Sequence, residues 1–250
     1  MDADSRLKAL AERQWRDYRS GRPGIAFAEP GLALTLSEAY GVQAEVARLR
    51  CAAGDAIAGY KVGCIGAGVV EQFGMAGPIR ALLFRSELRA SGAEIRYEDH
   101  ANLAIEGEMA IRIGAGGAVV AAFPVIELHN FVFRAARKTL AELVANNGIN
   151  AGVVVPHHLT ETPNSRWVDA RKLSVDINGR TVDSGALWPF PGGPEESVAW
   201  LRSSLSLQDR ALASGDLVLT GTPLGLYPVK PDDHVVVKVD GEAHVDCFIT

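Results

Sequence analysis

Residues 103–113 are the stretch that most constrains what this chain can fold into. Apolar side chains alternate there with alanine and glutamate, and a period of two is that of a β-strand, whose successive side chains point to opposite faces. Glu106 and Glu108 would share one face, with alanines before and after them. The opposite face would be apolar: Leu103, Ile105, Met109 and Ile111. The pattern therefore predicts a strand that packs on a core with one face and presents two carboxylates on the other.

The paired carboxylates predict a site for a divalent cation. Alternate strand residues are about 7 Å apart, and two negative charges at that distance repel each other unless a positive charge lies between them. Oxygen ligands select hard ions, so magnesium or manganese is favoured over zinc. The pattern alone is also typical of an ordinary solvated strand face, and this alternative stays open at this point.

Three further residues are candidates for the same site. Glu127 lies within the apolar stretch 123–128, where a metal ion or a buried salt bridge would explain a charge that is costly to bury. Lys61 lies at a glycine-flanked strand end; near a metal its pKa would fall so that it could move protons, and a lysine that reaches solvent from a sheet edge is the equal alternative. His129 could add a ligand, but a histidine that forms hydrogen bonds near the site is the favoured interpretation.

The rest of the chain predicts an α+β fold in two parts. The first 55 residues have apolar side chains at helical spacing, and Thr35 and Glu38 form a capping-box pattern at a helix start. Strand patterns separated by glycine and proline dominate from residue 56 onward. We therefore expect an N-terminal helical segment, 1–55, and a catalytic β-rich domain, 56–250, with a largely antiparallel or mixed sheet.

Two hairpins are predicted within the β-rich part. Asn178-Gly179 and Asp240-Gly241 separate strand patterns by two residues that tolerate positive φ. The expected strands are residues 57–62, 79–84, 103–113 (the longest), 173–177, 180–183, 235–239 and 243–249, and the expected helices after residue 55 are 69–73, 138–146 and 194–205.

Composition excludes several classes of protein. The formal net charge is -5 and no basic run interleaved with aromatics is present, so nucleic acid is not expected as a partner. No apolar run approaches the roughly 20 residues that span a bilayer, and the N-terminus is acidic without a signal-peptide core, so we expect a cytoplasmic protein. Cys51, Cys64 and Cys247 are odd in number and form no CxxC pair, which predicts reduced thiols.

Taken together, these segments resemble the fumarylacetoacetate hydrolase superfamily, and within it the branch of 2-keto-4-pentenoate hydratases and 4-oxalocrotonate decarboxylases. The resemblance extends from about Leu36 to the C-terminus. The segments that carry it occur in the family's order: residues 59–63 (GYKVG), 105–108 (IEGE), 124–127 (PVIE), 146–152 (NNGINAG), 184–201, 214–221 (SGDLVLTG) and 228–231 (PVKP).

The resemblance implies a rolled, mixed β-sheet with the helical segment as an appendage, and a homo-oligomer. It also implies a Mg²⁺ or Mn²⁺ ion that binds the carboxylate and the 2-oxo oxygen of a small 2-oxo acid. The residues it implies are Glu106, Glu108 and Glu127 as metal ligands, Lys61 for proton transfer or carboxylate binding, and Asn150 and Thr220 as contacts to substrate oxygens.

Departures from the branch pattern leave three hypotheses about function open. Pro78-Ile79 stands where such hydratases carry Pro-Asp, and Ala104 stands where a basic residue often precedes the Glu-x-Glu strand. Ile149-Asn150 replaces a serine pair, and 220–223 (TGTP) resembles acylpyruvate hydrolases. The first reading is a hydratase of 2-hydroxydienoic acids. The second is a 4-oxalocrotonate-type decarboxylase or acylpyruvate hydrolase, and the third is a non-catalytic 2-oxo acid binder or partner subunit of a related lyase.

Overall fold

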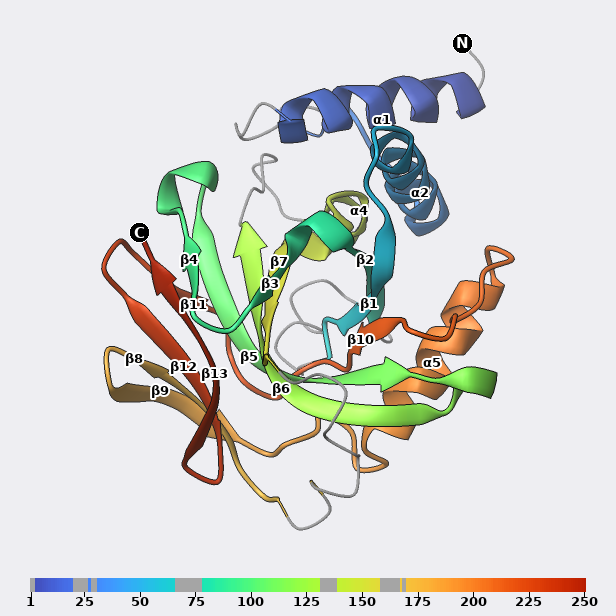
Figure 1. Cartoon of the computed structure of the whole chain (residues 1–250). Coiled ribbons are helices and arrows are strands. Elements are labelled where there is room, and N and C mark those ends of the chain that lie inside the picture. Colours follow the sequence, from blue (N-terminus) through green and yellow to red (C-terminus); the bar gives the residue numbers. More distant parts are fainter. Residues whose placement is uncertain are drawn as a thin grey trace.

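The computed structural model describes residues 3–19, 27, 31–65, 78–130, 139–157, 167 and 170–250. The helix expected at 69–73 and residue 138, the expected start of another helix, lie outside these residues. Figure 1 shows a large curled sheet, a smaller sheet against it and a group of helices at one end. This is the expected α+β fold with a rolled, mixed sheet.

The larger sheet contains eight strands within the described part of the chain, in the order β2-β1-β10-β5-β6-β7-β3, and β11 pairs with β5 off this path. The sheet is mixed because β1/β10 and β3/β7 are parallel pairs, whereas β5/β6 and β6/β7 are antiparallel. Its strands are β1 (Ile57–Gly63), β2 (Ile79–Phe84), β3 (Leu88–Ala90), β5 (Leu103–Ile113), β6 (Val119–Asn130), β7 (Asn150–Val155), β10 (Leu217–Leu219) and β11 (Tyr227–Pro228).

The smaller sheet has the order β4-β13-β12-β8-β9. Its strands are β4 (Ala93–Ile95), β8 (Leu173–Ile177), β9 (Arg180–Gly185), β12 (His234–Val239) and β13 (Glu242–Ile249). The main core lies between the two sheets, because the apolar face of β5 packs in one cluster with buried valines of β8 and β12.

Helices lie around the larger sheet. Helices α1 and α2 pack together and, with α4, enclose a second apolar cluster against β2. The helices of the described residues are α1 (Ala3–Arg19), α2 (Leu36–Ala52), α4 (Leu140–Ala145) and α5 (Pro194–Ser206), with short 3-10 turns η1 (Arg85–Glu87), η2 (Tyr97–Asp99), η3 (Ala115–Gly117) and η4 (Asn147–Ile149).

The local signals for helix starts and turns are confirmed. Thr35 is the N-cap of α2 and forms the complete capping box with Glu38. The turn Asn178-Gly179 joins β8 to β9 with φ values of 53° and 76°, and Asp240-Gly241 joins β12 to β13 with φ values of 48° and 88°. All four residues adopt the left-handed backbone that a tight hairpin requires.

The expectation that 103–113 would be the longest strand is wrong. Strand β6 has 12 residues and β5 has 11. Residues 119–126 of β6 are all apolar, so the sequence lacks there the alternation of apolar and polar residues that marked β5.

The three cysteines are free. None of the helices in the described ranges combines the length and apolar character needed to cross a bilayer.

Candidate metal centre

The antiparallel pairing of β5 with β6 brings the acidic residues together. Glu106 lies directly opposite Glu127, and His129 lies opposite Ala104, whose small side chain leaves room for the imidazole. Glu108 projects from the same face of β5 one strand period further along. The polar groups therefore meet on the face of β5 that is turned away from the main core.

Glu127 is the centre of the contacts. Its Oε1 lies 2.6 Å from Lys61 Nζ and accepts a hydrogen bond from Asn150 Nδ2 at 2.7 Å. Its Oε2 lies 3.5 Å from His129 Nε2, and the same nitrogen lies 3.0 Å from Glu106 Oε2. One oxygen of Glu127 is thus held by Lys61 and Asn150, while the other faces His129.

Glu106, Glu127 and His129 each offer one ligand atom, and these three atoms lie within 4.8 Å of one another. Within the described ranges, these two carboxylates and one imidazole form the group of side chains that could hold a metal ion. Glu108 is not in this group: its Oε1 accepts the backbone N–H of Gly221, which follows β10. The structure therefore gathers two of the three expected carboxylate ligands, adds His129, and places the third carboxylate beside them.

The charges at the centre act strongly on one another. Burial, with the charges of Glu127 and Glu106, raises the pKa of Glu108 well above its usual value. Burial alone would also raise the pKa of Glu127, but Lys61 and His129 outweigh it and hold that pKa below the usual range. The pKa of Lys61 is raised, not lowered as expected. Burial lowers this pKa, but the nearby carboxylates, above all Glu127, raise it by more.

The two expected substrate contacts already have partners within the chain. The Asn150 side chain donates to Glu127 through Nδ2, and its Oδ1 accepts the N–H of Gly152 at 3.1 Å. The Thr220 side chain is completely buried, and its hydroxyl donates to the Met109 carbonyl at 2.8 Å. Contact of either residue with a substrate stays a prediction.

Two glycines support the centre without any local sequence signal that would single them out. Gly148 has φ +59°, and a Cβ there would lie 2.9 Å from Lys61 Cε. Gly221 has φ +88°, and a Cβ there would lie 1.8 Å from Ile65 Cδ1. Both positions therefore require glycine, one to make room for the lysine and the other to bring an N–H to Glu108.

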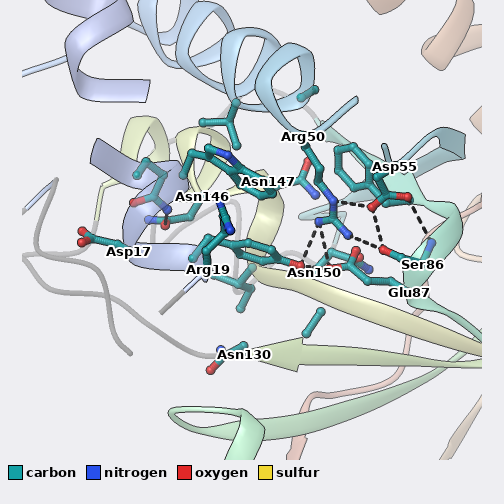
Figure 2. A pocket seen from close by; sticks show the side chains of 18 of the residues that line it. Asp17, Arg19, Arg50, Asp55, Ser86, Glu87, Asn130, Asn146, Asn147 and Asn150 are labelled. Atoms are coloured by element: carbon teal, nitrogen blue, oxygen red, sulfur yellow. Dashed lines mark hydrogen bonds and ion pairs between the residues drawn. The ribbon is translucent and has the colours of Figure 1, made fainter. Parts of the chain in front are cut away.

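A cavity of about 510 Å³ adjoins the centre and shares Asn150 with it. Figure 2 shows Asn146, Asn147 and Asn150 in its wall, near Arg50 and Glu87. Residues of α1, α2, η1 and β7 line it, so the helical segment and the sheet together form the cavity beside the carboxylates.

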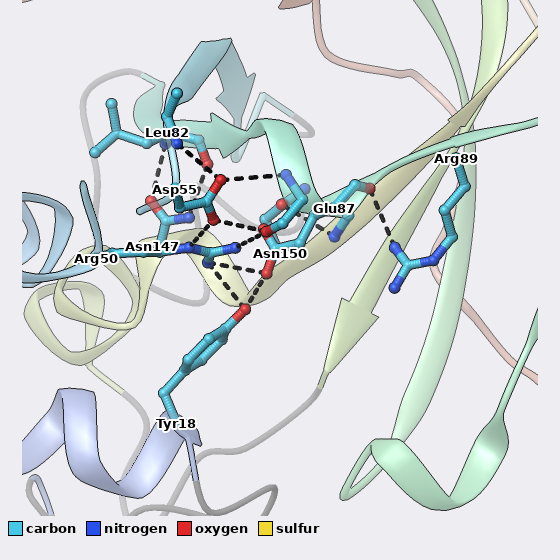
Figure 3. A network of polar contacts seen from close by, with 11 residues as sticks. Tyr18, Arg50, Asp55, Leu82, Glu87, Arg89, Asn147 and Asn150 are labelled. Carbon is cyan, nitrogen blue, oxygen red and sulfur yellow. Dashed lines mark hydrogen bonds and ion pairs between the residues drawn. The ribbon is translucent and has the colours of Figure 1, made fainter. Parts of the chain in front are cut away.

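A buried polar network forms one wall of this cavity (Figure 3). Arg50 of α2 lies 2.9 Å from Glu87 Oε1 and donates to Asp55 at 2.7 Å and to Ser86 at 3.0 Å. Tyr18 of α1 donates to the same Glu87 oxygen and accepts from Arg50 at 2.9 Å. The network therefore connects both N-terminal helices to η1, which precedes β3.

Known proteins resemble this chain over most of its length. A 4-oxalocrotonate decarboxylase of Pseudomonas sp. (strain CF600) is 26% identical over 222 residues, 83% of each chain. A 2-hydroxyhexa-2,4-dienoate hydratase of Comamonas testosteroni is 24% identical over 257 residues, 94% of each chain. The solved structure of 4-oxalocrotonate decarboxylase from Pseudomonas putida G7, complexed with magnesium and adipate, superposes with a TM-score of 0.86 at 22% identity and covers 100% of this chain and 99% of that one.

A family model also matches most of the chain. The model of the fumarylacetoacetate (FAA) hydrolase C-terminal family matches residues 76–247. This range contains Glu106, Glu108 and Glu127 and ends within the last strand, β13. The chain therefore belongs to the fumarylacetoacetate hydrolase family.

Proposed function

We propose that this chain is a divalent-metal-dependent lyase of small 2-oxo and 2-hydroxydienoic acids, with hydration as its reaction. The observation that carries the proposal is the convergence of Glu106, Glu127 and His129 beside the buried amine of Lys61. Similar proteins are a dienoate hydratase and 4-oxalocrotonate decarboxylases, which supports this class of substrate.

The donor groups suit Mg²⁺ or Mn²⁺. Glu106 and Glu127 offer carboxylate oxygens, and Glu108 is close enough for their charges to raise its pKa, after the larger effect of burial. A divalent charge would offset this repulsion, so all three carboxylates are proposed to hold the ion. A bound divalent cation supplies a Lewis acid that stabilises negative charge on the oxygens of a 2-oxo acid.

Lys61 is the proposed proton donor. Its side chain is buried, and Nζ lies 2.6 Å from Glu127 Oε1. The ammonium group is therefore shielded from exchange of its protons with solvent. A hydratase must place a proton on carbon to convert the dienol into the ketone before water adds to the distal double bond. Lys61 Nζ supplies that proton and recovers one when the enol hydroxyl loses its own, while Asn150 keeps Glu127 in place by donating to Oε1.

Ile79 favours a second candidate reaction, decarboxylation of a 4-oxalocrotonate-type acid. The side chain at position 79 is apolar and 1% exposed, so no carboxylate there can activate water. Loss of carbon dioxide needs no attacking water: the bond to the carboxylate breaks, its electron pair stays on carbon, and a proton from Lys61 takes the vacated position. The same site would serve the hydrolysis of an acylpyruvate only if water were activated by another group.

A substrate panel with Mg²⁺ or Mn²⁺ tests these reactions. Loss of diene absorbance with incorporation of labelled oxygen from water is the expected result for hydration. Carbon dioxide release from 4-oxalocrotonate would instead assign decarboxylation, and pyruvate with a free acid would assign hydrolysis. Absence of turnover on every member of the panel, with magnesium-dependent oxalate binding retained, would contradict the lyase proposal and support a non-catalytic binder.

The proposal also covers the oligomeric state of the protein and its location in the cell. A cytoplasmic homo-oligomer is expected, with a complex with a related lyase as a further assembly, and residues 1–55 are proposed as an appendage to the catalytic domain at 56–250. Light scattering of the purified protein would give the mass of the assembly, and a mass of 26.6 kDa, that of one chain, would contradict it.

A further inference from the structure

His129 is the residue at the centre whose role the family resemblance does not assign. It lies on β6 opposite Ala104, and its side chain is 3% exposed. Its Nε2 is 3.0 Å from Glu106 Oε2 and 3.5 Å from Glu127 Oε2. Both oxygens belong to residues proposed as metal ligands, so the imidazole nitrogen lies where a third donor atom would lie.

The spacing of these three atoms suits a common ion. Neighbouring ligand atoms at about 2.1 Å from an octahedral ion are about 3 Å apart. The distances of 3.0 Å and 3.5 Å from His129 Nε2 to the two carboxylate oxygens are close to this value. Glu127 Oε1 is held by Lys61 and Asn150, so Oε2, the oxygen facing the histidine, is the one left for the ion.

The imidazole of His129 reaches the centre through Nε2 alone. His129 Nδ1 is buried and has no hydrogen-bond partner within the described residues. Here the carboxylates of Glu106 and Glu127 are the side chains that the ring engages, so its orientation is set toward the metal centre.

We propose that His129 Nε2 is itself a ligand of the metal ion, which makes the centre a mixed nitrogen and oxygen site. The inference rests on the proposed metal-dependent function and specifies it further. Imidazole binds transition ions much better than it binds magnesium. The site therefore selects Mn²⁺ and later first-row ions over Mg²⁺ more strongly than an all-carboxylate site would.

Pulsed electron paramagnetic resonance on the Mn²⁺-loaded wild-type chain tests the bond directly. The expected result is a nitrogen modulation from a coordinated imidazole, which changes when the protein is made with ¹⁵N-histidine. The modulation should vanish in His129→Gln, which replaces the ring nitrogen by an amide oxygen at similar reach. Bound Mn²⁺ without nitrogen modulation in the wild type would overturn the proposal and leave His129 as a hydrogen-bond donor to Glu106. Modulation that persists in His129→Gln would overturn it too, because another nitrogen would be the ligand.

Calorimetric titration of Mg²⁺ and Mn²⁺ gives a second, independent readout. The preference for Mn²⁺ over Mg²⁺ should fall by at least about 10-fold from wild type to His129→Gln, the scale on which single groups around a metal change its affinity. His234→Gln is the matched control, because His234 pairs with Asp246 on the smaller sheet. An unchanged preference in His129→Gln contradicts the ligand assignment alone, whereas a wild-type chain that binds neither ion contradicts the proposed function as well.

Discussion

Glu108 and Glu127 project from neighbouring strands, yet their surroundings act on their protons in opposite directions. Burial and two nearby carboxylates raise the pKa of Glu108, whereas Lys61 and His129 overcome the effect of burial and lower the pKa of Glu127. Three carboxylates thus face two basic groups in the metal-free protein. A divalent ion would favour the ionised form of Glu108 and so oppose the raised pKa.

Replacement of Glu108 by glutamine should separate metal binding from stability. In the metal-free protein the raised pKa of Glu108 contributes stability that is fully present below the ordinary value of 4.5 and is lost as the pH rises toward the folded-state pKa. Glu108→Gln lacks this loss, so its free energy of unfolding in the presence of a chelator should rise relative to wild type between pH 5 and pH 8. Its magnesium affinity and its turnover should fall together.

Urea unfolding at the two pH values, with titration calorimetry, measures both effects. Glu94→Gln, at an exposed glutamate of β4, is the control and should change neither quantity. Full activity of Glu108→Gln after chelation would show that Glu108 has no metal role.

Substitution of Lys61 should stop the chemistry. Lys61→Ala removes the amine 2.6 Å from Glu127, and turnover should fall by at least ~100-fold, the usual effect of losing a proton-transfer group. Lys172→Ala, at an exposed lysine, should retain wild-type turnover. Circular dichroism must show that the variant is folded, because its Glu127 keeps a buried charge. A folded Lys61→Ala with a wild-type rate would leave the lysine only a structural role.

At the scale of elements, β5, both hairpins and the fully buried β2 could be predicted from local patterns, whereas β6 could not. The alternation in β5 identified Glu106 and Glu108 as a pair on one face, and tight turns gave both hairpins. Strand β6 lacked this alternation, and its register with β5, which places Glu106 opposite Glu127, depends on tertiary pairing. Gly107 illustrates the same limit: a Cβ there would lie 2.4 Å from Val175 Cγ2 of the smaller sheet, a contact that no local pattern contains.

The residues of the candidate site could be predicted from the sequence of each strand. Which of them face one another across paired strands could not. The carboxylates and Lys61 were predicted from their unusual apolar surroundings and from the family resemblance. The sequence also predicted His129 near the site, as a hydrogen-bonding residue or a ligand, but its position opposite Ala104 depends on the pairing of β5 with β6. Position 104 carries alanine in place of a basic residue, and His129 of the neighbouring strand β6 supplies a basic side chain at this point.

The Arg50 network should fix the helical segment to the sheet. Arg50→Met removes the positive charge that faces Glu87, and both side chains are more than nine-tenths buried. Breaking such a buried pair from one side costs about 3–5 kcal/mol, mainly because a charge is left unpaired. The double variant Arg50→Met/Glu87→Gln should recover part of this loss in urea unfolding.

The exposed pair of Arg6 in α1 with Glu38 in α2 provides a comparison with the buried pair. Arg6→Ala should lower the free energy of unfolding far less than Arg50→Met does, because solvent already screens that pair. A loss in Arg50→Met as small as that in Arg6→Ala would show that the buried network does not stabilise the attachment of the helices.

At the scale of the whole molecule, the metal centre joins distant parts of the chain. Strand β1 supplies Lys61, β5 and β6 supply the carboxylates, β7 supplies Asn150, and the segment after β10 supplies the N–H that binds Glu108. An ion bound at this point interacts with residues that unfolding would separate. It should therefore stabilise the entire fold rather than one loop.

Metal removal should accordingly lower the melting temperature of the whole chain. An ion present at 100 times its dissociation constant stabilises the folded state by about 2.7 kcal/mol, which for a chain of this size is a shift of roughly 5–10 °C. Calorimetric melting in a chelator and in saturating Mg²⁺ or Mn²⁺ would measure the shift, and Glu94→Gln should show the wild-type response. In Glu108→Gln the shift should shrink, since one ligand is lost and the metal-free form has already been relieved of repulsion. Equal melting temperatures of the wild-type protein with and without the ions would mean that the carboxylates hold no metal in the folded state.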